Sequence, residues 1–338
     1  MPASDPSICG IPIKYASLVI LVVQNSALYL MLRASRARGD NETLYLPGTA
    51  VVLAESFKLL SSLLLIAIQE GGPIGMLRRL HTDIIGQPIT TLKIMVPAGL
   101  YTLQNTLQYM AVTYLDAATF QVTYQLKVLT TALFAVVLLG KRLSLMQWIS
   151  LVMLTAGVAL IQMPDSETED EHSIAERFMG LIMVVTACFS SGFAGVYFEK
   201  VLKGETAGVW VLNVQLAGMG VIIALSSVLY SHYDRVMKQG FLYGYNKEAY
   251  IAISLQAFGG LIVAVVVKYA DNILKGFATS ISIILSSIVS ALYLDFVVTS
   301  RFGFGALLVI ASTYVYGTFA PAKPTKTIPI TKITTGSK

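Results

Sequence analysis

Residues 117–139 read AATFQVTYQLKVLTTALFAVVLL, an apolar run whose one charged side chain is that of Lys127. The run is long enough to cross the hydrocarbon core of a bilayer as a helix, which takes about 20 residues. A charge near the centre of such a helix costs roughly 2.5 to 3.5 kcal/mol on insertion scales, so it faces protein or water rather than lipid. The stretch therefore predicts a membrane-spanning helix that aims a lysine into an internal cavity.

The composition of the whole chain agrees with this prediction. Of its 338 residues, 55% are hydrophobic and 13% are charged, whereas soluble domains devote about a quarter of their residues to Asp, Glu, Lys and Arg. The two cysteines, Cys9 and Cys188, are too few for a disulfide framework. We expect the net charge of +5 to reside in loops and tails beside membrane lipid, and we expect no nucleic-acid partner.

Ten apolar runs of spanning length occur along the chain. The first is too long for the hydrophobic region of a signal peptide, so it is counted as a span. We predict an all-α membrane protein with ten transmembrane helices, at residues 13–32, 47–68, 92–112, 117–139, 145–162, 179–201, 209–229, 249–269, 274–294 and 302–319.

An acidic stretch between the fifth and sixth spans divides the chain into two sets of five. Because five is odd, the second set enters the membrane from the side opposite to the first, which is how inverted-topology repeats arise. Lys and Arg are more frequent in the loops that share a side with the termini, which favours cytosolic termini. The predicted organisation is an N-terminal cytosolic tail (1–12), a first five-helix repeat (13–162), an acidic lumenal connector (163–178), a second five-helix repeat (179–319) and a C-terminal cytosolic tail (320–338).

The span around Lys127 carries a polar stripe. Phe120, Thr123, Tyr124 and Lys127 recur on one face at helical spacing, and leucines and valines occupy the opposite face. Lys127 has no carboxylate one turn away in its own helix. We therefore expect this lysine to have a function rather than a role in a structural ion pair.

Two other spans of the first set also carry polar groups. The span at residues 92–112 has a polar face formed by Tyr101, Gln104, Asn105 and Gln108. The span at residues 47–68 holds Glu55 and Lys58, which are close enough to pair across one helical turn. That pair is either a compensating ion pair or a substrate contact, and the sequence leaves both open.

The second set contributes fewer polar residues. Lys275 lies in the ninth span, which has the same ordinal place in its set as the span of Lys127, so the two lysines could form a paired anion clamp. Asn213 is a single polar residue and a weaker signal. Gly192 lies in a cluster of small residues, which is either a close-packing face or part of a backbone-lined pocket.

Together these residues predict an anionic ligand with a polar, partly aromatic body. Lysines suit phosphate, amide side chains suit the edge of a base, and aromatic rings suit stacking. Gly140-Lys141 lacks the upstream glycine of a phosphate-binding loop, and the three histidines lie in separate loops. We expect no catalytic residue, no metal and no cofactor, and transport driven by gradients or exchange.

Four longer motifs complete the pattern: YTLQN (101–105), AATFQVTYQLK (117–127), SGFAGVYFEK (191–200) and KYADNILKGFATS (268–280). They resemble the Golgi nucleotide-sugar transporters of the drug/metabolite transporter superfamily, and the resemblance runs from about Ile13 to Tyr316. GIPIKY (10–15) and VQNSAL (23–28) are similar to fungal UDP-galactose transporters in particular.

The resemblance implies an antiporter in the Golgi membrane that exchanges cytosolic nucleotide sugar for lumenal nucleoside monophosphate. Motif matching implies that the base and ribose meet Tyr101, Gln104, Asn105 and Asn213, that the phosphates meet Lys127 and Lys275, and that Glu55 and Lys58 line the sugar end or a gate. The full set of predicted substrate-binding residues is Glu55, Lys58, Tyr101, Gln104, Asn105, Phe120, Tyr124, Lys127, Gly192, Asn213 and Lys275.

Substrate choice is less sharply indicated. Phe120 and Gln108 are as in the UDP-galactose group, whereas Asp116 and the pair Asp295-Phe296 are closer to UDP-N-acetylglucosamine carriers. The leading hypothesis is a UDP-galactose/UMP antiporter, which functions as a monomeric unit or as a homodimer. The alternatives are a UDP-N-acetylglucosamine or dual-substrate carrier of the same family, a membrane-embedded transferase that uses a sugar nucleotide, and an exporter that shares only the fold.

Overall fold

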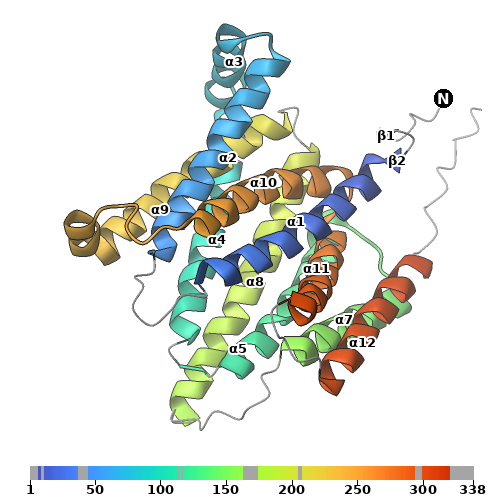
Figure 1. Ribbon diagram of the computed structural model, residues 1–338. Coiled ribbons are helices and arrows are strands. Elements are labelled where there is room, and N and C mark those ends of the chain that lie inside the picture. The colour runs from blue at the N-terminus through green and yellow to red at the C-terminus, as the bar shows by residue number, and fades with distance from the viewer. Residues whose placement is uncertain are drawn as a thin grey trace, which may run out of the picture.

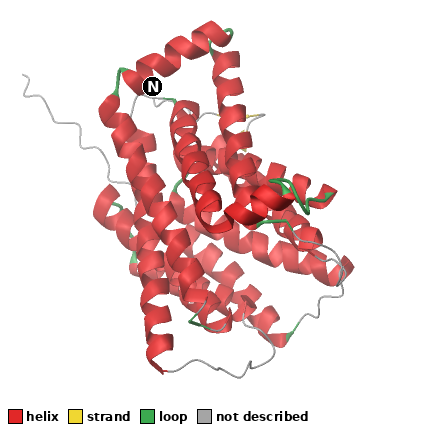
Figure 2. Ribbon diagram, turned by 90° about the vertical axis from the view of Figure 1, so that its left-hand side faces the viewer, coloured by secondary structure: helices red, strands yellow, loops and turns green. Residues whose placement is uncertain are grey.

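The chain is built almost entirely of helices (Figures 1 and 2). This computed structural model describes residues 7–8, 11–36, 45–112, 114–115, 117–162, 174–204, 208–293 and 299–319. The long helices are α1 (Ile13–Arg36), α2 (Pro47–Gln69), α4 (Pro88–Val112), α7 (Leu145–Gln162), α8 (Ile174–Gly204), α9 (Val209–Gln239), α10 (Lys247–Tyr269), α11 (Asn272–Tyr293) and α12 (Ser300–Thr318). The shorter elements are α3 (Pro73–Leu80), the π-helical turn η1 (His81–Ile85), α5 (Ala117–Tyr124), α6 (Leu126–Leu139) and the antiparallel strands β1 (Ser7–Ile8) and β2 (Ile11–Pro12).

Every predicted span coincides with helical chain, but the span at 117–139 forms two helices instead of one. α5 ends at Tyr124 and α6 begins at Leu126, with Gln125 in a turn between them. There the Val128 N–H donates to the Gln125 carbonyl at 3.1 Å, an i to i+3 bond in place of the α-helical pattern. The break therefore lies beside Lys127, in the middle of the stretch that the sequence predicted to be one helix.

Two further differences concern the connections. α8 begins before its predicted span, at Ile174, and α9 ends beyond its predicted span, at Gln239; the added turns are exposed and interrupted by charged residues. The connection between α2 and α4 contains α3 and η1, which the apolar pattern did not predict. Gly72, at φ 138°, turns the chain after α2, and Pro73 begins α3 in the first helical position that proline favours.

Six helices among the described residues are long and apolar enough to cross a membrane. They are α1 (over Ile13–Leu32), α2, α8, α9, α10 and α11 (over Asn272–Leu292). α6 and α7 (over Leu145–Ile161) are shorter apolar helices. Many of their outward-facing side chains are apolar and exposed, such as Leu64 and Val137, as expected for surfaces that contact lipid.

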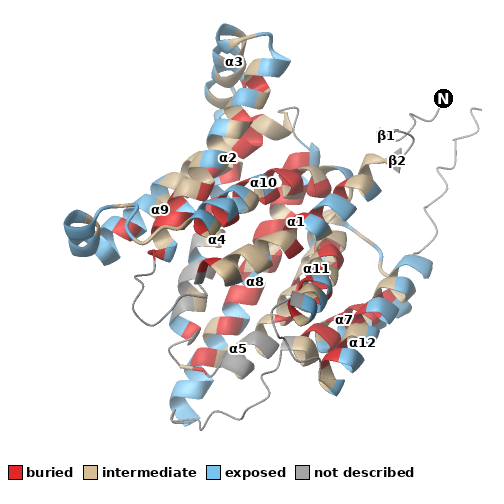
Figure 3. Cartoon of the chain, viewed as in Figure 1, coloured by how far each residue is buried: buried red, intermediate tan, exposed pale blue. Residues whose placement is uncertain are grey.

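The helices pack in pairs that join the first half of the chain to the second. α7 packs on α12, α2 on α9, α4 on α8, and α1 on α10, and weaker contacts join α6 to α8, α1 to α11, α2 to α10 and α4 to α9. The pairs are symmetric between the halves. If α1 corresponds to α8, α2 to α9, α4 to α10, α5 and α6 to α11, and α7 to α12, then each contact has a counterpart: α4 on α8 corresponds to α1 on α10, and α6 on α8 corresponds to α1 on α11. Buried residues lie along the inner parts of the bundle, whereas α3 and the last turns of α9 are mostly exposed (Figure 3).

One end of this arrangement is a close helix contact. α7 and α12 approach so closely that a Cβ atom on Gly157 would lie 2.8 Å from the Gly305 carbonyl, and one on Gly305 would lie 2.7 Å from the Gly157 carbonyl. Around this contact lie Leu151, Leu154 and Val309, all fully buried. Small residues at a helix crossing are the usual means by which spanning helices pack closely.

Candidate functional site

The turn between α5 and α6 brings together an amide, two aromatic rings and a lysine. The Gln104 amide nitrogen of α4 donates to the Tyr124 hydroxyl at 2.9 Å. The rings of Phe120 and Tyr124 stack with centroids 5.7 Å apart. The Lys127 ammonium lies 4.3 Å from the centroid of the Tyr124 ring, within the range of a cation–π contact. The predicted polar stripe is thus one contiguous cluster.

Lys127 is held in place through its backbone. Its carbonyl accepts from the hydroxyls of Thr130 at 3.1 Å and Thr131 at 2.7 Å. Thr130 also donates to the Cys188 carbonyl at 2.7 Å, which ties α6 to α8. A Cβ atom on Gly192 would lie 2.7 Å from the Thr130 hydroxyl oxygen, so this glycine allows the two helices to approach at the level of the cluster.

The ammonium group of Lys275, on α11, is close enough to interact electrostatically with Lys127 and with the buried carboxylate of Glu199. Among the described residues, neither Lys127 nor Lys275 has a carboxylate within ion-pair distance. Two neighbouring ammonium groups inside a helical bundle repel each other, and both are favoured by a bound anion. The two halves of the chain contribute one lysine each.

Glu55 and Lys58 of α2 form an ion pair, with the Lys58 nitrogen 2.7 Å and 2.6 Å from the two carboxylate oxygens. The pair packs on helices of the second half. A Cβ atom on Gly220 of α9 would lie 2.7 Å from a Glu55 oxygen, and one on Gly260 of α10 would lie 2.7 Å from Lys58 Cδ. The compensating pair that the sequence left open is therefore present, and it lies between the halves.

The remaining predicted residues belong to α4 and α9. Asn213 is buried at 2% exposure, and its amide nitrogen has no hydrogen-bond partner within the described parts of the chain. Gln104 likewise has a buried amide oxygen to which no described residue donates. Tyr101 is half-buried on the same helix as Gln104. Asn105 lies on α4, but its side chain is outside the part of the chain that the structure describes.

This arrangement is suited to binding rather than to bond chemistry. It offers two cations for phosphate, two amides with unused hydrogen-bonding atoms, and stacked rings. Among the described residues, no group of His, Cys, Asp and Glu is placed to hold a metal ion. The chemistry of the cluster therefore matches an anionic, partly aromatic ligand.

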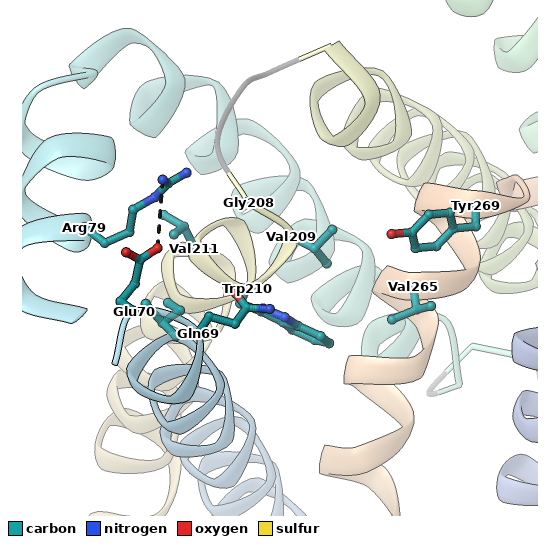
Figure 4. Close-up of a pocket in the computed structure, with 10 residues that line it drawn as sticks. Gln69, Glu70, Arg79, Gly208, Val209, Trp210, Val211, Val265 and Tyr269 are labelled. Carbon is teal, nitrogen blue, oxygen red and sulfur yellow. Dashed lines mark ion pairs between the residues drawn. The ribbon is translucent and has the colours of Figure 1, made fainter. Parts of the chain in front are cut away.

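A cavity of about 260 Å³ lies elsewhere, between the end of α2 and the facing ends of α9 and α10. Figure 4 shows Trp210 and Tyr269 on its walls, with Arg79 directed toward Glu70 at 4.0 Å. None of the predicted site residues lines it. The two interior lysines, Lys127 and Lys275, define the candidate site better than this cavity does, because the positive charges that would bind an anion are there.

The opposite end of α2 is closed by aromatic contacts. Tyr45 and Tyr245 pack with ring centroids 4.9 Å apart, and the hydroxyls of Thr49 and Tyr245 are 2.7 Å apart. Tyr245 lies in the connection between α9 and α10, and burial raises its pKa to about 12. Its hydroxyl therefore remains protonated throughout the neutral range.

Sequence reasoning missed a buried ionic cluster around Glu199, a residue with no exposed surface. Glu199 pairs with Lys141 and Lys203 and accepts from the Asn272 N–H, and Lys141 also pairs with Asp271. Glu199 and Lys203 could have been paired from their i, i+4 spacing, but the sequence carries no periodic signal that connects them to Lys141.

Comparison with known proteins gives the family. The model of the nucleotide-sugar transporter family matches residues 10–317. A UDP-N-acetylglucosamine transporter of Mus musculus is 52% identical over 310 residues, which cover 90% of this chain and 95% of the relative. A UDP-galactose translocator of Mus musculus is 48% identical over 307 residues, which cover 90% of this chain and 78% of the relative.

A crystal structure of a protein matches with a TM-score of 0.66 at 14% identity, covering 91% of this chain and 98% of the other, and this likeness concerns the fold alone. The family match and the names of the relatives confirm the resemblance that the motifs indicated. They identify a multi-pass membrane transporter rather than an enzyme. The chain belongs to the nucleotide-sugar transporter family.

Proposed function

We propose that this chain is an antiporter that exchanges a UDP-linked sugar for UMP across the Golgi membrane. The observation that carries the proposal is the pair of interior lysines, Lys127 and Lys275, which lie in electrostatic range of each other and have no carboxylate partner among the described residues. UMP and a UDP-sugar both carry phosphate, so one pair of cations can serve both directions of exchange. Gln104, Asn213 and the rings of Tyr101 and Tyr124 would receive the base and ribose.

The mechanism we propose is alternating access by two inverted five-helix halves, 13–162 and 179–319. The mapping of helix pairs between the halves supports this arrangement, because inverted repeats rock around a site at their interface. The break between α5 and α6 supports it as well, since discontinuous helices commonly bear ion and substrate sites in transporters. The termini would then be cytosolic and the connector at 163–178 lumenal.

For the sugar, we place UDP-N-acetylglucosamine first and UDP-galactose second. The Mus musculus relative named for UDP-N-acetylglucosamine is 52% identical to this chain, and the Mus musculus relative named for UDP-galactose is 48% identical. The sequence features that favour UDP-galactose, Phe120 and Gln108, keep it as the second candidate. The Glu55–Lys58 pair would line the sugar end of the site or a gate.

The test is counterflow in proteoliposomes. Purified protein in vesicles loaded with UMP should take up labelled UDP-N-acetylglucosamine or UDP-galactose, and unlabelled competitors will rank the two. Lys127→Gln should reduce exchange by about tenfold or more, as expected when a charge-assisted contact of roughly 1.5 to 3 kcal/mol is lost. Lys200→Gln, a change at an exposed lysine of α8, is the matched control. Normal exchange by Lys127→Gln would exclude the phosphate role of Lys127.

A further inference from the structure

A second cluster of charges lies one helical turn from Lys275, at the end of the bundle where α6, α8 and α10 finish and α11 begins. Its centre is Glu199, which has no exposed surface. One carboxylate oxygen of Glu199 is 2.8 Å from the Lys203 ammonium and 3.2 Å from that of Lys141. The other accepts from the backbone N–H of Asn272 at 2.9 Å. Both oxygens of this carboxylate are therefore engaged, one by Lys203 of the same helix and by Lys141, the other by the chain at the start of α11.

Asp271 extends the cluster to the start of α11. Its carboxylate lies 3.1 Å from the Lys141 ammonium and also accepts from the Leu274 N–H at 2.8 Å, which caps α11. Lys203 donates to the Ala270 carbonyl at 2.6 Å. The turn that leads into α11, and with it the position of Lys275, is thus held by charged groups of α8 and by Lys141.

Lys141 is the member of this cluster that comes from the first half of the chain. It follows Gly140, the left-handed residue that ends α6, and α6 is the helix that carries Lys127 near its start. Its ammonium nitrogen is inaccessible and lies at ion-pair distance from both carboxylates, although the angles are not those of hydrogen bonds. The contact is therefore an attraction between charges, which holds without a fixed bond direction.

We propose that Lys141 is a positioning residue for transport: it joins the helix of Lys127 to the helix of Lys275 and so closes this end of the bundle around the substrate. The proposal rests on the function proposed above. The ion pairs of this one residue link the end of α6 to the first turn of α11. Opening at this end must separate Lys141 from Glu199 and Asp271, because the first belongs to one half and the others to the second.

We expect the protein to fold without Lys141, because Glu199 and Asp271 both keep other hydrogen-bond donors. Glu199 keeps Lys203 and the Asn272 N–H, and Asp271 keeps its cap on α11. Removing one partner of a wholly buried pair is strongly destabilising, but here each carboxylate retains another donor. Loss of Lys141 should therefore weaken closure much more than it weakens folding.

The experiment measures separation, binding and exchange on the full chain. Spin labels at Leu145→Cys and Gly204→Cys report the distance between the halves at this end, since Leu145 is exposed and a side chain at Gly204 meets no other atom within 4 Å. Cys9→Ser and Cys188→Ser remove the native thiols, and a serine at 188 can keep the bond to the Tyr124 carbonyl. UMP binding and UMP-driven exchange are measured beside the distance.

In Lys141→Gln, we expect the distance between the spin labels to shift to longer values. We expect exchange to fall by about tenfold, which is in the usual range for energetic coupling between sites. UMP binding should stay within about twofold of the parent. Asp271→Asn, which keeps the cap of α11, should give the same split between exchange and binding. Lys141→Arg should restore both distance and exchange, and Lys200→Gln should change neither.

The proposal is overturned if Lys141→Gln and Asp271→Asn leave the distance unchanged or exchange normal. It is also overturned if Lys141→Arg does not have the distance and the exchange rate of the parent. If the parent protein exchanges none of the nucleotide sugars offered, the proposed function fails. The distance measurement still decides whether Lys141 closes this end, so the two failures can be told apart.

Discussion

At the scale of single residues, the site depends on polar atoms that are buried but not fully used. Gln104 donates to Tyr124, but no residue that the structure describes donates to its amide oxygen, and none accepts from the amide nitrogen of Asn213. Buried amides are normally satisfied, because an unmet group costs about 1 to 3 kcal/mol. Their unused atoms are therefore available to a bound ligand.

We predict that Tyr124→Phe weakens UMP binding by about 1 kcal/mol, or about fivefold, because the Gln104 amide loses the hydroxyl that orients it. The aromatic ring beneath Lys127 is kept, so the stacking with Phe120 and the cation–π contact remain. Calorimetric or fluorescence titration with UMP measures the change, and Tyr230→Phe, at a tyrosine that is 93% exposed, is the control. Unchanged binding in Tyr124→Phe would show that the hydroxyl does not orient Gln104 for the ligand.

Tyr245 gives a prediction about pH. Burial raises its pKa from 10.0 to about 12, so the folded protein retains this proton after the unfolded chain has lost it. Its contribution to stability is fully present below about pH 10 and is lost as the pH rises toward 12. Thermal unfolding midpoints between pH 8 and pH 11 should fall more steeply for the parent than for Tyr245→Phe. If the midpoints of the parent and of Tyr245→Phe fall by the same amount, burial does not raise the pKa of Tyr245.

At the scale of helices, Gly192 allows α8 to approach α6 beside Lys127. Gly192→Ala would place a Cβ atom 2.7 Å from the Thr130 hydroxyl oxygen and 2.8 Å from the Thr130 carbonyl carbon. We expect this overpacking to destabilise the ligand-free protein by about 1 to 3 kcal/mol. Gly218→Ala, where no atom lies within 4 Å of the added carbon, should cause no loss.

The measurement is thermal unfolding in detergent, with and without UMP. Equal midpoints for the parent and Gly192→Ala in the absence of ligand, combined with weaker UMP binding, would favour the alternative role of Gly192 in a backbone-lined pocket. If Gly192 serves only for close packing of α6 and α8, the midpoint of Gly192→Ala is lower than that of the parent both with and without UMP.

The sequence predicts the helices well because an apolar run of spanning length has few other stable conformations in a bilayer. It also predicts which residues of α4, α5 and α6 share a face, since helical spacing is visible in the sequence. The break at Gln125 is not visible, because neither a glycine nor a proline marks it in the sequence. The Glu199 cluster is not visible either, because it joins Lys141 to residues of the other half, and no periodicity relates positions so far apart.

At the scale of the whole molecule, the two halves mirror each other in their helix contacts but not in their ends. Near Tyr245 the first and second halves meet through aromatic rings and hydroxyls, whereas near Lys141 they meet through ion pairs. In a rocking transporter one end closes as the other opens. Salt screens ion pairs but has little effect on contacts between aromatic rings. We therefore predict that salt weakens closure at the Lys141 end and not at the Tyr245 end.

The proposed arrangement also predicts which residues face which side of the membrane. If the halves are inverted, an even number of spans separates the N-terminus from Arg142, which follows α6, and an odd number separates it from Met237, near the end of α9. Both side chains are exposed. In sealed Golgi vesicles that keep their native orientation, an impermeant maleimide should label Arg142→Cys directly and Met237→Cys only after the membrane is permeabilised. Labelling of both positions from one side would contradict the inverted arrangement, because α7, α8 and α9 together make an odd number of crossings between them.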